Sequence, residues 1–87
     1  MFLITVYDVG EKRVAKVLKI CRKYLNWVQN SVLEGEITKA KFEKLKAELK
    51  EAMDESEDSV IFYILRDTKY SAREILGTEK QSTDNFI

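Results

Sequence analysis

The chain has 87 residues, of which 45% are hydrophobic and 34% charged, and its formal net charge is zero. This size and balance are typical of one small folded domain and argue against a disordered chain. With no histidine and one cysteine, the sequence excludes histidine-based acid–base catalysis, a Ser-His-Asp triad, zinc bound by these residues and an internal disulfide.

The distribution of apolar and charged residues indicates the expected location of the chain and the kind of surface that it presents. No apolar run approaches the ~18–20 residues of a membrane span, and the N-terminus lacks the pattern of a signal peptide. We therefore expect no membrane contact and, from the lone Cys21, a reducing cytoplasmic location. Residues 1–30 carry a net charge of +4 and residues 31–58 a net charge of −4. The neutral total therefore hides a basic N-terminal region.

Residues 2–10 form a short apolar, β-branched and aromatic run that ends in glycine. Such a run predicts a strand buried on both faces. Asp8 interrupts it near its end, and a carboxylate so close to a core strand is costly unless something compensates it. Asp8 is therefore the first candidate for chemistry. The alternative is that Asp8 caps the following helix or begins a turn.

Residues 11–25 carry apolar side chains at helical spacing, which predicts a helix with one face on a sheet. Cys21 belongs to this apolar stripe and is interpreted as a core residue. The rest of the helix carries cations almost exclusively, namely Lys12, Arg13, Lys16, Lys19, Arg22 and Lys23. These cations suit a phosphate backbone, and the alternative is an ordinary solvated helix face.

Residues 26–37 alternate in polarity and predict either one long bent strand or two strands. Trp27 in this segment is interpreted as a core or an interface residue. Thr38 is predicted to cap a second helix, whose apolar stripe extends to Met53. The acidic run 54–58 lacks the spacing and glycine of a calcium loop, so we interpret it as a solvated turn.

Residues 59–66 form the second strong apolar run and predict a central strand beside the first. Residues 67–69 predict a turn, and residues 70–76 predict a weaker strand. After a polar spacer the chain ends on Phe86 and Ile87, an apolar end that is either frayed or docked on a neighbour. This order predicts an α+β ferredoxin-like sandwich, an antiparallel sheet with two helices on one face.

Several segments, taken together, resemble one family over nearly the whole chain. They are YDV at residues 7–9, VQNSVLEG at 28–35, EDSV at 57–60, REILG at 73–77 and TDN at 83–85. The second of them resembles the family's VQxSVFEG signature, with leucine in place of the usual phenylalanine. By these motifs, in this order, the chain is similar to the CRISPR-associated protein two family, the small partner of the spacer-integration complex.

The resemblance implies a ferredoxin-like homodimer in which a C-terminal strand is exchanged. Residues 1–78 would form the domain, and residues 79–87, with Phe86 and Ile87, would dock on the partner subunit. The resemblance also implies that the Asp8 side chains of both subunits meet near the dimer axis. There Asp8 would be the catalytic residue and the ligand of Mg²⁺ or Mn²⁺.

Two main functions follow from the resemblance, both in CRISPR spacer acquisition and antiviral defence. One is a metal-dependent endonuclease acting on single-stranded RNA or double-stranded DNA. The other is a non-catalytic scaffold that binds DNA and bridges dimers of the integrase, CRISPR-associated protein one. The expected nucleic-acid contacts are Lys12, Arg13, Lys16 and Lys19. A toxin-like ribonuclease or a small-ligand module of the same fold is a third alternative.

Overall fold

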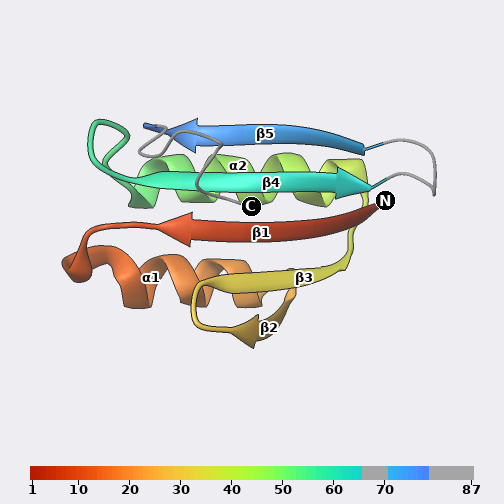
Figure 1. The fold of residues 1–87 in the computed structure, drawn as a ribbon, viewed down its shortest axis with the longest axis horizontal. Helices are drawn as coiled ribbons and strands as arrows, with labels where there is room; N and C mark the ends of the chain where they lie inside the picture. Colours follow the sequence, from red (N-terminus) through yellow and green to blue (C-terminus); the bar gives the residue numbers. More distant parts are fainter. Residues whose placement is uncertain (66–70, 79–87) are drawn as a thin grey trace, which may run out of the picture.

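A computed structural model describes residues 1–65 and 71–78 of the chain. The elements are β1 (Phe2–Asp8), α1 (Glu11–Arg22), β2 (Asn26–Gln29), β3 (Val32–Glu36), α2 (Lys39–Ala52), β4 (Ser59–Leu65) and β5 (Ser71–Gly77). The strands form one antiparallel sheet in the order β2-β3-β1-β4-β5, and both helices lie on the same face of it (Figure 1).

The first six elements follow the βαββαβ connectivity of the ferredoxin-like sandwich, and β5 extends the sheet beyond β4. The predicted α+β class, antiparallel sheet and pair of helices are therefore confirmed. Exchange of a C-terminal strand in a dimer remains a prediction. The predicted turn at 67–69, together with Phe86 and Ile87, lies outside the described residues. No helix in the described ranges has the length and apolarity needed to cross a membrane.

Strand β1 lies at the centre of the sheet but is covered by helices on one face only. Its burial alternates strictly along the strand, with Leu3 and Tyr7 buried and Ile4 and Val6 partly exposed. The prediction of a strand buried on both faces is therefore wrong for β1. The physical reason is that α1 and α2 lie on the same face, so no helix of the described residues covers the opposite face.

The alternating segment after α1 forms two strands, one of the two predicted arrangements. The strands β2 and β3 make a hairpin, and Asn30 at its turn has φ of 40°, a left-handed value that asparagine tolerates better than most residues. Trp27 is 50% exposed, so it is not a core residue. Helix α1 ends at Arg22, earlier than predicted, although Leu25 is buried as its spacing indicated.

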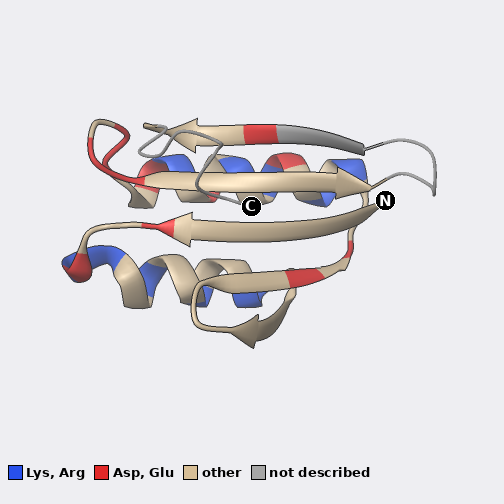
Figure 2. Ribbon diagram, viewed as in Figure 1, with Lys and Arg blue, Asp and Glu red and all other residues tan. Residues whose placement is uncertain are grey.

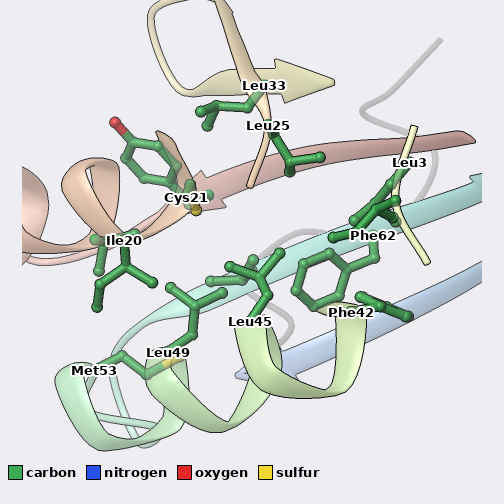
Figure 3. Close-up of a cluster of buried hydrophobic side chains, with 14 of the residues drawn as sticks. Leu3, Ile20, Cys21, Leu25, Leu33, Phe42, Leu45, Leu49, Met53 and Phe62 are labelled. Atoms are coloured by element: carbon green, nitrogen blue, oxygen red, sulfur yellow. The ribbon is translucent and has the colours of Figure 1, made fainter. Parts of the chain in front are cut away.

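The core lies between the helices and the sheet, where apolar side chains from both helices and from β1, β3 and β4 point toward one another (Figure 3). Thr38 caps α2 as predicted, its Oγ1 accepting a hydrogen bond of 3.2 Å from the Lys41 amide. The rings of Phe42 and Phe62 meet edge to face, with centroids 5.0 Å apart. Cys21 is fully buried as predicted, and burial raises the pKa of its thiol to about 12.

One polar side chain in this core gives a prediction about stability. Thr5 on β1 is fully buried, and its hydroxyl has no hydrogen-bond partner in the described part of the structure. Because an unsatisfied buried hydroxyl costs about 1–3 kcal/mol, Thr5→Val is expected to raise the free energy of unfolding by about 1 kcal/mol. Urea unfolding measures this change.

The matched control is Thr38→Val, which removes a hydroxyl that does accept a hydrogen bond. This variant is expected to lower the free energy of unfolding by about 1 kcal/mol. A loss of stability in Thr5→Val would contradict the prediction and would indicate a buried water bound to the Thr5 hydroxyl.

Candidate functional site

Asp8 is the last residue of β1 and its side chain is exposed. Strand alternation places it on the helix-free face of the sheet, the face that Ile4 and Val6 also occupy. The N-cap position of α1 is Gly10, so the alternative interpretation of Asp8 as the helix cap is not borne out. The carboxylate is thus presented at one end of the central strand, beside Ser59 of β4 in the strand register.

A carboxylate oxygen is a ligand that Mg²⁺ and Mn²⁺ accept readily, and exposure leaves Asp8 accessible to such an ion. However, residues 1–65 and 71–78 contain no group of three or more acidic or cysteine side chains that could hold a metal. The described part of one chain therefore does not form a metal site alone. Any further ligands would come from outside these described residues, for example from a second copy of the chain, from the substrate or from water.

A second carboxylate, Asp58, lies fully buried immediately before β4. It accepts hydrogen bonds from Arg13 Nε at 2.5 Å and Nη2 at 2.9 Å, from the Gly10 amide at 2.8 Å and from the Asp54 amide at 2.9 Å. The Arg13 guanidinium, aided by these amides, holds the pKa of Asp58 well below its usual range. We call this set of contacts the Asp58 clamp.

The Asp58 clamp ties together the chain segments at the end of the sheet where Asp8 lies. The Asp58 carboxylate accepts a hydrogen bond from the amide of Gly10, which lies two residues after Asp8. The Asp58 carbonyl accepts a second hydrogen bond, of 2.8 Å, from the amide of Thr78, which follows β5. Gly77 allows this approach, because its φ is +92° and a Cβ there would lie 1.9 Å from the Asp58 carbonyl oxygen. Asp58 therefore connects the loop that follows Asp8 with the chain segment that follows β5.

The interpretation of the acidic run as a solvated turn holds for part of it and is wrong for Asp58. Residues 55–57 are exposed, whereas Asp58 is 0% exposed. The reason is that Asp58 directly precedes an apolar central strand, so its carboxylate enters the core boundary and requires a cation. The argument that singled out Asp8, an acid adjoining a core strand, also applies to Asp58 and could have identified it.

The cations predicted on the first helix separate into two groups in the structure. Arg13 donates two hydrogen bonds to Asp58 and lies 3.5 Å from Glu57, so its guanidinium is already engaged. Lys12, Lys16 and Lys19 are exposed, and none of them forms an ion pair with another described residue. Figure 2 shows these positively charged positions recurring along α1.

The fold and site define a small α+β protein of ferredoxin-like connectivity, with an exposed carboxylate at the end of the central strand and a lysine-bearing first helix. The family model described as CRISPR associated protein Cas2 matches residues 1–73, and the chain belongs to this family. The resemblance inferred from the sequence motifs is thus confirmed.

Individual relatives support this assignment over the full length. Two proteins named CRISPR-associated endoribonuclease Cas2, from Dictyoglomus turgidum and Thermotoga maritima, are each 60% identical to this chain over 87 residues. The alignments cover all of this chain and 100% and 99% of these relatives. A solved structure described as "Crystal structure of cas2" is similar with a TM-score of 0.74 at 38% identity, covering 95% of this chain and 93% of that one.

Proposed function

We propose that this protein is a metal-dependent endoribonuclease of CRISPR spacer acquisition that acts as a homodimer with Asp8 as its catalytic carboxylate. The observation that carries the proposal is the exposed Asp8 at the end of β1, on the helix-free face of the sheet. Full-length relatives at 60% identity that are named endoribonucleases give the reaction class.

The helix-free face of the sheet supports the homodimer. A sheet face that remains in water usually carries polar side chains at alternate positions. Here it carries partly or well exposed apolar side chains on three neighbouring strands, namely Phe2, Ile4, Val6, Val32, Tyr63 and Leu65. A second copy packed on this face by two-fold symmetry would cover these side chains and would bring a second Asp8 toward the first.

Two Asp8 carboxylates would supply hard oxygen ligands of the type that Mg²⁺ and Mn²⁺ prefer. A bound divalent ion supplies Lewis-acid stabilisation of negative charge on a phosphate. The role of Asp8 would be to hold that ion on the face where the two subunits meet.

The test is a cleavage assay with the purified protein, labelled single-stranded RNA and labelled double-stranded DNA, in Mg²⁺, Mn²⁺ or EDTA. We expect cleavage of the RNA that requires the metal, stops in EDTA and returns when excess Mg²⁺ is added. Cleavage that persists in EDTA would contradict the metal dependence. Absence of cleavage on both substrates would contradict the nuclease proposal.

A scaffold that binds DNA and bridges integrase dimers is the second candidate, favoured by the three exposed lysines of α1. It would be supported by salt-sensitive DNA binding without cleavage, and by loss of that binding when Lys16 and Lys19 are changed to glutamate. Docking of residues 79–87 on a partner remains a prediction, because that segment lies outside the described residues.

A further inference from the structure

The single tryptophan of the chain lies on the surface at the edge of the sheet. Trp27, in the edge strand β2, is 50% exposed, although its position is fixed by two contacts. The indole N–H donates a hydrogen bond of 2.9 Å to the Asn30 carbonyl, and the Arg22 guanidinium lies over the ring, 5.5 Å from its centroid. The ring is therefore held in place while half of its surface faces water.

Trp27 is separate from the Asp8 site. In the strand register Trp27 lies opposite Leu33, which in turn lies opposite Thr5, and both of these residues are buried on the helix side of the sheet. Residues directly opposite each other in an antiparallel pair share a face. Trp27 therefore lies on the helix side of the edge strand, whereas Asp8 lies on the helix-free side.

The surface next to Trp27 is positively charged. A shallow depression on α1 is lined by three cations, Lys19, Arg22 and Lys23, together with Ala15 and Leu18. Lys23 is paired with Glu48, whereas Lys19 has no ion pair among the described residues. The positions of Lys12, Lys16 and Lys19 follow one side of the helix, which rises by roughly 15 Å between residues 12 and 22. A row of cations thus leads along α1 toward the exposed ring.

We propose that Trp27 and Arg22 form a stacking site for an unpaired base of single-stranded nucleic acid, whose phosphates contact the lysines of α1. The inference rests on the proposed function, because it assumes that the chain handles nucleic acid. A base stacks on an exposed indole or on a guanidinium plane with a gain of about 1–3 kcal/mol per base. Bases inside a duplex are already stacked on their neighbours, so this site selects single strands.

The lysines of α1 favour a nucleic acid over the alternative ligand, a protein strand that pairs with the edge strand β2. An apolar protein segment would gain nothing from the lysines of α1 and would have to desolvate them, whereas a phosphate backbone neutralises them. Arg22 over the indole ring also suits a planar aromatic ligand better than an aliphatic side chain.

The fluorescence of Trp27 provides a direct test, because no other tryptophan contributes to the signal. The protein carrying Asp8→Asn is titrated in EDTA with a short single-stranded oligoribonucleotide and with a blunt RNA duplex. We expect the single strand to quench the fluorescence and the duplex to leave it nearly unchanged. Trp27→Ala is expected to weaken single-strand affinity, measured by anisotropy of a labelled oligonucleotide, by about 5- to 150-fold.

Val28→Ala is the matched control, since Val28 is equally exposed on the same strand and should not change the affinity. Equal affinity of Trp27→Ala and its parent, equal quenching by the duplex, or the absence of binding would each overturn the inference. Loss of self-association in Trp27→Ala would also overturn it, in favour of a protein interface. If Trp27→Ala leaves metal-dependent cleavage unchanged, the proposed function stands whether or not the stacking inference does. If single strands quench the Trp27 fluorescence but nothing is cleaved by the parent, the stacking inference stands and the proposed nuclease function fails.

Discussion

Replacing Asp8 with asparagine is expected to lower the rate of metal-dependent RNA cleavage by roughly 100-fold or more. Asparagine preserves the size of the side chain but removes the negative charge that would hold a divalent ion. In a homodimer the substitution removes both carboxylates at once, so no remaining acid of the pair compensates. The measurement is the initial cleavage rate of labelled single-stranded RNA as Mg²⁺ is titrated.

A matched control separates this effect from a general change in charge. Glu11→Gln makes the same chemical change at an exposed acid three residues later, in the first turn of α1, and should leave the rate unchanged. Urea unfolding of the Asp8→Asn variant checks that it is folded under the assay conditions, so that a lower rate reports on the site. A cleavage rate within a factor of a few of the parent's would exclude Asp8 as the catalytic ligand.

Features determined by local sequence were predicted well. The apolar runs predicted at residues 2–10 and 59–66 contain the strands β1 (Phe2–Asp8) and β4 (Ser59–Leu65), because burial in the sheet removes their apolar side chains from water. Thr38 was identifiable as a helix cap from its position just before an amphipathic segment. Asp8 was proposed as a site candidate because a charged residue interrupts an otherwise apolar strand, and its role in the site remains a prediction.

Features that depend on contacts between distant segments could not be predicted. Arg13 and Asp58 are 45 residues apart. The apolar periodicity of a sequence predicts helices and strands, but it does not indicate which charged side chains pair. For residues 26–37, the choice between the two predicted arrangements, one bent strand or two strands, was left open, because it depends on the left-handed backbone of Asn30 at the turn. The face on which Trp27 lies is set by the shifted register of the hairpin, a tertiary property.

Replacing Asp58 with alanine is expected to lower the free energy of unfolding by about 3–5 kcal/mol. The substitution leaves the Arg13 guanidinium and the amides of Gly10 and Asp54 without the carboxylate that they share. Small domains have a total stability of about 5–15 kcal/mol, so the loss is a large fraction of it. Urea unfolding followed by circular dichroism measures the change.

Glu57→Ala is the matched control for the Asp58 clamp, because Glu57 is the adjacent acid and also faces Arg13. Its side chain is 68% exposed and lies 3.5 Å from the guanidinium, so its loss should cost less than about 1 kcal/mol. Equal effects of the two substitutions would show that the buried contacts of Asp58 contribute no more than a surface ion pair.

Acid titration gives an independent measurement of the Asp58 clamp. The pKa of Asp58 is lower in the folded chain than the value of about 3.9 that aspartate has when unfolded. The carboxylate therefore stabilises the fold fully above that unfolded value, and this contribution is lost as the pH falls toward the folded pKa. We expect the stability of the parent to decrease steeply below about pH 4, and that of Asp58→Asn to decrease less over the same range. Parallel curves for the two proteins would contradict the assignment of Asp58 as a buried, ionised group.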